Sequence, residues 1–249
     1  MQARSSDSLL GDSSSVKKAL YQSALTTQQR LLLLGLNFLP LAHLAAVIAV
    51  AILLPAQVLW RVTAAIAVLY LAPPLLARTL RALFAIPEGK IPLGSQAFFS
   101  WWALFQLQMI FCRVPQLEEM LRLVPGAYSA WLRLWGAQIG RLTFWSPGTV
   151  ILDRPFLSVG DDVVFGAAIH INPHVLAKNA SGRIELILGT VKIGDRVRIG
   201  GYSLLTAGSE IAPDEDPRAL LVLPPFSTWK NGKRVRADKF HKSSIHARP

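Results

Sequence analysis

An interval of six residues between apolar side chains constrains the fold of this chain more than any other feature. Ile193, Ile199, Leu205 and Ile211 stand six residues apart, and glycine follows the first two. Two series upstream keep the same spacing: Val159, Phe165 and Ile171, and Ile139, Trp145 and Ile151. An α-helix repeats about every 3.6 residues and an ordinary strand every two, so neither produces such a series. A period of six fits a β-helix, in which each flat face contributes one inward side chain and each coil stacks on the next.

The repeat is interrupted once, by residues 173–190, which do not follow the period. An insertion in a solenoid maps to a loop on one face, and such loops often carry function. We therefore expect a mainly β domain of about four coils over residues 136–212. A C-terminal extension with a basic tail, residues 213–249, follows it.

Two long uncharged stretches precede the repeat. Residues 31–60 contain His43 as their only ionisable side chain, and residues 62–77, after Arg61, are uncharged. Each stretch approaches the roughly 20 residues that cross ~30 Å of hydrocarbon. Apolar residues make up 52% of the chain and charged residues only 16%, an excess that a water-facing fold does not need. We predict a transmembrane helical hairpin over residues 31–84, with a buried soluble hairpin as the alternative.

Basic residues flank both ends of this hairpin, whereas its turn carries only Arg61: Lys17, Lys18 and Arg30 precede it, and Arg78, Arg81 and Lys90 follow it. By the positive-inside bias both ends are cytoplasmic, which predicts the inner (cytoplasmic) membrane and membrane lipids as partners. The apolar run begins only at Leu31, which argues against a cleaved signal peptide. Residues 1–30, rich in Ser, Gln and Thr, are expected to form a flexible arm.

Aromatic and amide side chains are mixed in the uncharged residues 91–112. This mixture suits the headgroup layer, so we expect interfacial helices over residues 85–135, with a third span over residues 91–112 as the alternative. A break is expected at Pro125-Gly126. We expect apolar anchors and headgroup contacts in this region at the following residues: Leu117, Met120, Leu121, Trp131, Leu132 and Leu134, and Arg113, Arg122 and Arg133.

The net charge of +11 fits nucleic acid, an anionic membrane face or an anionic cosubstrate. The basic residues are spread along the chain, alternate with acidic ones and form no recognition motif, so nucleic-acid binding is not expected. Cys112 is the only cysteine, which excludes an internal disulfide framework and a multi-cysteine zinc knuckle.

The segment VGDDVVFGAAIHINPHVLAKNASGRIELILGTVKIGDRVRIGG, residues 159–201, resembles the catalytic segment of the hexapeptide-repeat sugar O-acetyltransferases, such as maltose and galactoside acetyltransferase. Both have the order repeat, histidine, excursion, repeat. WLRLWGAQIG, residues 131–140, together with the hairpin resembles the membrane-anchored C-terminal domains of ε-poly-lysine synthetases. The resemblance implies a left-handed parallel β-helix, acyl-CoA as cosubstrate, and sites between the subunits of a homotrimer. It does not cover the first 30 residues.

Acyl transfer from a thioester needs a base for the proton of the acceptor and donors for the oxyanion. Histidine is the usual base near neutral pH, and the repeat region offers His170 and His174. His174 opens the excursion, where the resembling family has its catalytic histidine. We therefore expect His174 to be the base and His170, within the repeat, to be structural or to line the pocket.

The chain departs from the family pattern just before this histidine. The sugar acetyltransferases carry an asparagine in the preceding coil, where this chain has Ala168, and Asn172 is the candidate substitute. Glu185 in the excursion is the candidate carboxylate that orients His174, with a solvated surface residue as the alternative.

The resemblance also implies a binding path for coenzyme A along the coils. Its pantetheine would lie against small residues, which permit close approach to the backbone, at Gly200, Gly201, Ser203 and Ala207. Downstream, PPFSTWKNGKRVR resembles the closing segment of the family, with Trp229 and Gly232 matching and a Pro-Ala pair missing. The basic residues expected at the nucleotide phosphates are Lys230, Lys233, Arg234 and Arg236, with a solvated tail or an anionic-lipid contact as the alternative.

These features predict a membrane-anchored acyltransferase. It would move an acyl group, acetyl in the first instance, from acyl-CoA to a hydroxyl or amine of an envelope-type or amphipathic acceptor, small or lipid-linked. No metal is expected. A zinc-dependent hydratase on the same fold is one alternative, although it needs three converging histidines and the domain offers only His170 and His174. A non-catalytic, membrane-tethered β-helix scaffold is the other.

Overall fold

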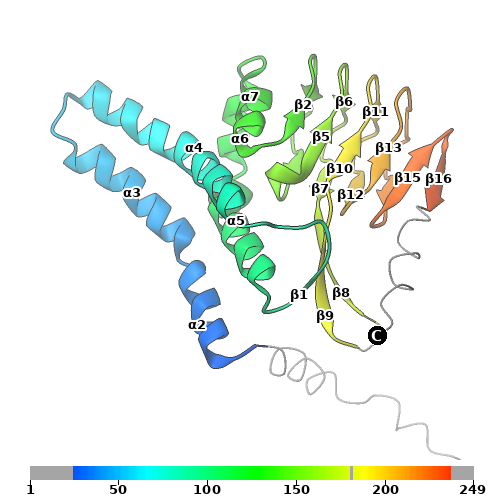
Figure 1. Ribbon diagram of the computed structural model, residues 1–249. Coiled ribbons are helices and arrows are strands. Elements are labelled where there is room, and N and C mark those ends of the chain that lie inside the picture. Colours follow the sequence, from blue (N-terminus) through cyan, green and yellow to red (C-terminus); the bar gives the residue numbers. More distant parts are fainter. Residues whose placement is uncertain (1–24, 180–181, 237–249) are drawn as a thin grey trace, which may run out of the picture.

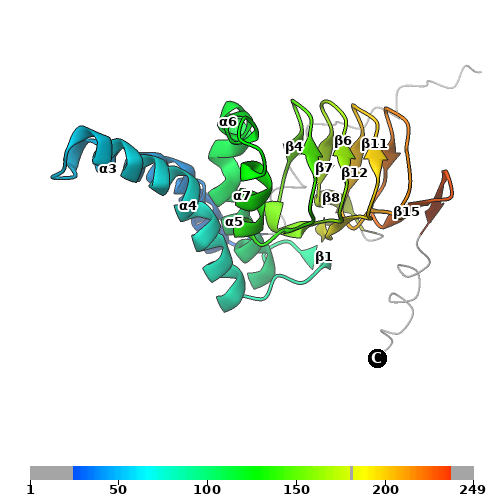
Figure 2. The ribbon, with the colours of Figure 1, turned by 90° about the horizontal axis from the view of Figure 1, so that it is seen from above.

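The computed structural model describes residues 25–179 and 182–236, with helices first and short strands after them (Figure 1). The helices are α2 (Thr27–Leu36), α3 (Leu39–Leu53), α4 (Val58–Leu83), α5 (Gln96–Arg113), α6 (Gln116–Arg122) and α7 (Ala127–Trp135). A short strand, β1 (Gly89–Pro92), lies between α4 and α5. Seen from above, α3 and α4 project to one side of the molecule and the stacked strands extend to the other (Figure 2).

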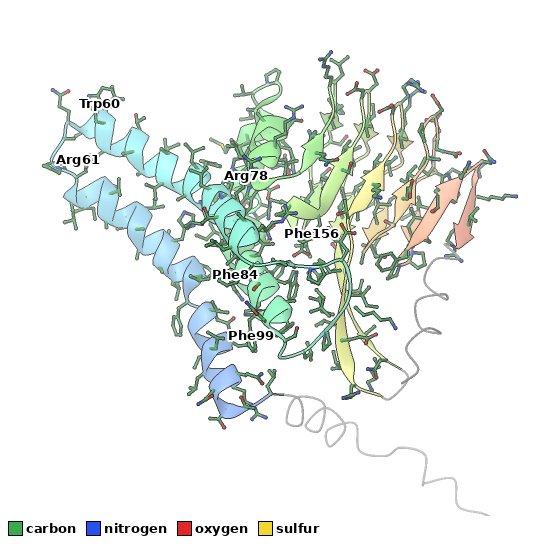
Figure 3. All side chains as sticks on the ribbon, in the orientation of Figure 1. Trp60, Arg61, Arg78, Phe84, Phe99 and Phe156 are labelled. Atoms are coloured by element: carbon green, nitrogen blue, oxygen red, sulfur yellow. The ribbon has the colours of Figure 1, made fainter. Side chains whose placement is uncertain are left out.

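α3 and α4 pack against each other as the helical hairpin expected from the sequence. Arg61 closes its turn, because the guanidinium donates to the carbonyl oxygens of Ala56 at 2.8 Å and Ile52 at 3.4 Å, at the C-terminal end of α3. Trp60 and Arg61 lie at the free tip of the hairpin (Figure 3). Thr27–Leu53 and Val58–Leu83 are both long and apolar enough to cross a membrane, by length and composition.

The helical region begins earlier than expected. α2 starts at Thr27, inside the stretch assigned to a flexible arm, because Thr26 and Gln29 form a capping box. The Thr26 hydroxyl accepts from the Gln29 backbone N–H at 3.3 Å, and the Gln29 side chain accepts from the Thr26 N–H at 2.9 Å. The boundary of the arm at residue 30 is therefore wrong, and residues 1–24 lie outside the described residues.

α5 lies between the hairpin and the strands rather than at the protein surface. Phe98, Trp101 and Phe111, expected in the headgroup layer, are buried inside the protein, as are the side chains of Gln106 and Gln108. The two amides have protein partners, so they do not need water or lipid headgroups. The interfacial interpretation is therefore wrong for these side chains.

α6 and α7 also bury residues that the sequence assigned to the membrane surface. Trp131 and Leu132, expected anchors, are in the core, whereas Met120 is exposed. Arg122, an expected headgroup contact, is nearly buried and forms ion pairs with Glu118 and Glu119. The assignments of Trp131 and Leu132 are wrong because α7 packs its apolar face on α4 and the first coil, and that of Arg122 is wrong because two carboxylates of α6 bind its guanidinium. The role of the exposed Met120 stays a prediction.

Most of the remaining strands form three parallel sheets, and the chain contributes strands to these sheets in a fixed order. The first sheet contains β2 (Gln138–Ile139), β5 (Leu157–Val159), β10 (Val191–Ile193), β13 (Glu210–Ile211) and β15 (Ser227–Lys230), with β16 (Lys233–Arg236) antiparallel at its edge. The second contains β3 (Phe144–Trp145), β6 (Val164–Phe165) and β11 (Arg198–Ile199). The third contains β4 (Val150–Ile151), β7 (His170–Asn172), β12 (Leu204–Thr206) and β14 (Val222–Leu223).

The six-residue period marks the interior of this stack. Ile193, Ile199, Leu205 and Ile211 are all buried, as predicted, while Arg196 and Arg198 are exposed. Residues of the same column pair across coils, for example Ile193 with Val159 on one side and with Ile211 on the other. The prediction of inward-facing apolar columns is confirmed.

The coils continue past the expected boundary at residue 212. Ile211 pairs with Trp229, and Leu205 pairs with Leu223, so residues 213–230 form a further coil. The period persists there through Pro217, which is buried at the position of an aliphatic residue. The expected boundary at residue 212 is wrong because Pro217 takes the next position of the six-residue series, where an aliphatic residue was expected. Residues 237–249, the last part of the predicted extension with its basic tail, lie outside the described residues.

The excursion folds back onto the helical part of the molecule. It forms a hairpin of β8 (His174–Lys178) and β9 (Ile184–Leu188), and β9 pairs antiparallel with β1. A 3₁₀ turn, Arg154–Phe156, interrupts the first coil nearby. The excursion, α5 and this turn together position the candidate site.

Candidate active site

The excursion and the first coil bring His174 and Asp153 together. His174 is the first residue of β8, and Asp153 immediately precedes the 3₁₀ turn, with a left-handed backbone (φ 46°). The imidazole Nδ1 of His174 and Oδ2 of Asp153 form a short hydrogen bond. The Asp153 side chain is fully buried, whereas 17% of the His174 side chain is exposed.

Aromatic side chains of α5 enclose this pair. The ring of Trp101 lies 4.9 Å from the His174 ring, centre to centre, and the ring of Phe105 lies 5.2 Å from it, both edge-on. The Trp101 indole Nε1–H donates to Oδ1 of Asp153 at 2.8 Å. Each carboxylate oxygen of Asp153 therefore has its own partner, which a buried carboxylate requires.

This arrangement is chemically suited to a general base. A carboxylate at Nδ1 holds the imidazole in the tautomer that leaves Nε2 free to take a proton, and it stabilises the imidazolium that follows. Nε2 of His174 has no hydrogen-bond partner among the described residues. An imidazole held in this way can act in acid–base catalysis near neutral pH.

A buried ionic cluster fixes the turn that carries Asp153. The Arg154 backbone N–H and guanidinium donate to Oε1 of Gln108 at 2.8 and 3.1 Å, and the guanidinium pairs with Glu118. Burial opposes the charge of Arg154, but Glu118 prevails and raises the pKa of the guanidinium. Burial and the Glu118 carboxylate raise the pKa of Tyr128, whose hydroxyl donates to Glu118 at 2.5 Å.

The structure corrects the predicted carboxylate partner of His174. Glu185 forms an ion pair with Lys90, 3.2 Å between Oε1 and Nζ, while Asp153 occupies the position expected of Glu185. His170 is exposed on the outer face of β7 and belongs to a different sheet from His174. Asn172 ends the same strand, and its buried Oδ1 has no partner among the described residues.

Of the four residues predicted to contact pantetheine, two lie in a turn and two are buried. Gly200 and Gly201 form the turn between β11 and β12, where a Cβ on Gly200 would meet the backbone nitrogen of Ala219 at 2.1 Å. Glycine is therefore required there by the next coil. Ser203 and Ala207 are buried, so they do not line a surface groove, and that prediction is wrong for both.

The residues expected at the nucleotide lie on β15, β16 and their turn. Trp229 continues an interior column after Ile211, at the C-terminal end of the stack. Together with five neighbours it lines a cavity of about 550 Å³: Asp216, Arg218, Ala219, Leu221 and Gly232. Lys230, Lys233 and Arg234 are exposed, and their contact with a nucleotide stays a prediction.

Sequence reasoning missed Asp153, Trp101 and Phe105. One signal for Asp153 was present, because the first coil departs from the period. After Ile151, the next residue of the stacked columns is Val159, which pairs with Ile139 and comes eight residues later instead of six. The extra residues make the turn that bears the carboxylate. The role of α5 had no such signal, because it depends on contacts between segments about 50 residues apart.

Several solved structures resemble part of this chain. A maltose O-acetyltransferase from Clostridium difficile 630 is 18% identical over 53% of this chain and 87% of that one, with a TM-score of 0.38. A hexapeptide-repeat-containing acetyltransferase from Vibrio cholerae is 18% identical over 52% of this chain and 91% of that one, with a TM-score of 0.33. A galactoside acetyltransferase in complex with coenzyme A is 14% identical over 51% and 82%, with a TM-score of 0.28. No protein-family model matches the chain, and no curated protein matches it.

Proposed function

We propose that this protein is a membrane-anchored acyltransferase that moves an acyl group, acetyl in the first instance, from acyl-CoA to a hydroxyl or amine. The observation that carries the proposal is the hydrogen-bonded pair of His174 and Asp153, where an excursion leaves a stack of parallel coils. We take this stack to be a left-handed β-helix, because its six-residue columns and three sheets fit that fold.

In the proposed reaction His174 acts first as a base and then as an acid. Nε2 of His174 takes the proton of the acceptor hydroxyl or amine as the acceptor atom attacks the thioester carbonyl. A new C–O or C–N bond forms and the C–S bond breaks. The imidazolium, stabilised by Asp153, then returns the proton to the departing thiolate, so the products are the acylated acceptor and the free thiol of CoA.

Exposed apolar side chains on α2, α3 and α4 support the membrane anchor. Large apolar residues exposed along these helices include Leu31, Leu34, Leu41, Ile48, Ile52, Leu59, Ile66, Leu71 and Leu75. A soluble monomer rarely exposes so large an apolar surface, whereas hydrocarbon stabilises it. We propose that the hairpin over residues 31–84 spans the inner membrane, with both ends and the coils cytoplasmic.

The position of α5 supports an amphipathic or lipid-linked acceptor of the envelope type. This helix contacts α3 and α4 with one side and packs over the His174–Asp153 pair with another. The acid–base pair therefore lies next to the helices proposed to contact lipid. An acceptor held in the membrane would reach it without leaving the bilayer surface.

The outer face of the third sheet supports a homotrimer. Its outward residues include Val150, Leu204 and the exposed Val222, and the neighbouring turns expose Tyr202 (67%) and Leu220 (73%). A second copy of the chain would cover these apolar side chains. Light scattering in detergent that gave the mass of a monomer would contradict the trimer.

Two other functions are tested by the same experiment. A zinc-dependent hydratase needs three converging histidines, whereas Nδ1 of His174 is taken by Asp153 and His170 is exposed on the outer face of β7. A scaffold without catalysis needs no imidazole enclosed by aromatic rings next to a buried carboxylate.

The proposal is tested by thiol release from acetyl-CoA with a panel of hydroxyl, amine and lipid-linked acceptors. We expect His174→Ala to remain folded and to lose about 10²–10⁴-fold in turnover, because the base is gone. His170→Ala is the matched control and should retain activity. A folded His174→Ala protein with near-normal transfer would remove His174 from the mechanism. Bound zinc that is lost in His174→Ala would favour the hydratase instead.

A further inference from the structure

We propose that Trp101 is a positioning residue for the acid–base pair, acting through Asp153. The inference rests on the proposed function, because it concerns the same site. The indole N–H of Trp101 holds Oδ1 of Asp153, so that Oδ2 is left for His174.

The burial of both partners makes this hydrogen bond important. Trp101 is 1% exposed and the Asp153 side chain is fully buried, so no water replaces a lost donor. A buried carboxylate oxygen without a donor pays its full desolvation cost. Two donors on two different oxygens fix the plane of the carboxylate, and that plane sets the direction in which the imidazole Nε2 points.

The helical repeat of α5 explains how this one helix positions both Asp153 and His174. Trp101, Phe105 and Gln108 lie on one stripe, at spacings of four and three residues. Trp101 binds Asp153, Phe105 packs on His174, and Gln108 binds the adjacent Arg154. A single face of α5 therefore holds two consecutive residues of the turn and the ring of His174.

The adjacent stripe of the same helix faces the hairpin. The indole N–H of Trp102 donates to Oδ1 of Asn37 at 2.9 Å, and Gln106 donates to the same oxygen at 2.8 Å. Asn37 lies at the junction of α2 and α3. Trp102 is therefore a matched control, since it is the same residue type on the same helix and its indole N–H also donates to a side-chain oxygen, at a more exposed position that does not reach Asp153.

The experiment compares Trp101→Phe with Trp102→Phe in the full-length protein. Trp101→Phe keeps an aromatic ring and removes the N–H, so kcat should fall about 10- to 100-fold while the KM for acyl-CoA stays unchanged. Without the indole donor, Asp153 attracts the imidazolium proton more strongly. The acid limb of the pH–rate profile should therefore move to higher pH. Trp102→Phe should leave kcat and the pH profile within about twofold of the wild type.

Three further measurements test the role of Trp101. In an Asp153→Asn background, Trp101→Phe should cost little more, because the residues act as one unit. Histidine-selective NMR should show a changed His174 Nδ1–H environment in Trp101→Phe, even if no acceptor has been found, which separates this inference from the proposed function. Thermal unfolding should show that each variant is folded.

Wild-type kcat and pH profile in a folded Trp101→Phe protein would overturn the inference. Equal losses in the Trp101 and Trp102 variants with an unchanged pH profile would also overturn it, since they would indicate a purely structural role for both indoles.

Discussion

Asp153 is buried in the protein, where an ionised carboxylate is energetically unfavourable. Its side chain is buried, its backbone is left-handed, and its two oxygens accept from Trp101 and His174. Transfer of such a group from water is unfavourable unless its hydrogen bonds are satisfied. The surrounding structure therefore holds a carboxylate at a position where burial is unfavourable, which is typical of functional sites.

Asp153→Asn should lower turnover by about 10²–10⁴-fold with little loss of folding, because the amide keeps the shape of the carboxylate but cannot hold the productive tautomer of His174. Steady-state kinetics of thiol release checks this. Asp162→Asn is the control, since Asp162 is also left-handed at a coil turn (φ 56°) but is exposed. Equal activity of the wild type and Asp153→Asn would exclude Asp153 from the mechanism.

Tyr128 gives the molecule an alkaline sensitivity. Burial and Glu118 raise its pKa in the folded state, so its contribution to stability is fully present below the ordinary tyrosine value of about 10 and is lost as the pH rises above it. As the pH rises above about 10, the melting temperature should therefore fall less steeply in Tyr128→Phe than in the wild type. At neutral pH the same variant should be less stable by about 1–3 kcal/mol, because Glu118 loses a buried donor.

An identical alkaline slope in Tyr128→Phe and the wild type would show that another group causes the loss.

Each coil is stabilised by the column of side chains that it shares with its neighbours. Ile199 is buried in β11, next to Phe165 of the preceding coil. Ile199→Ala should lower the free energy of unfolding by about 2–5 kcal/mol, because it leaves a cavity in a column that cannot collapse. Denaturant unfolding checks this. Arg198→Ala, on the exposed face of the same strand, should change stability by less than about 0.5 kcal/mol.

The interior of the coils could be predicted from the sequence, because a period of six depends only on local spacing. Ile193, Ile199, Leu205 and Ile211 followed directly from it. Pro217 did not, because proline was not counted as an apolar member of the column.

The environment of the helices could not be predicted in the same way. Trp101 and Trp131 are of a residue type that is common at membrane interfaces. Only the packing of α5 and α7 against the coils shows that they are core residues. For the candidate site, His174 was predicted from the excursion. Asp153 was not, because its partnership depends on a turn with an irregular length and on the position of α5.

The whole molecule has two different surfaces. The outer sides of α2, α3 and α4 expose apolar residues, whereas the turns after β10 and β13 carry charged ones such as Arg196 and Asp214, which pair with each other. The hairpin surface therefore favours hydrocarbon, and these turns favour water. This division agrees with a domain held at a membrane surface.

A reporter fused after Lys90 should be cytoplasmic, because basic residues flank both ends of the hairpin and only Arg61 lies in its turn. The full-length protein should also resist alkaline carbonate extraction. An extracytoplasmic reporter would overturn the topology, and release of the protein into the soluble fraction would overturn membrane anchoring. Replacement of exposed Leu41 and Ile48 by lysine should release the protein if these residues face lipid.

The irregular first coil implies that the site depends on chain length as much as on residue identity. Ile139 pairs with Val159, twenty residues later, whereas Ile193 pairs with Ile211, eighteen residues later. A two-residue deletion between Leu152 and Ser158 would restore the shorter spacing, and the columns could still stack. The carboxylate would then be withdrawn from His174. A relative of this chain that differs by that deletion alone would keep the architecture and lack the acid–base pair, so alignment gaps at this turn distinguish the two better than sequence identity does.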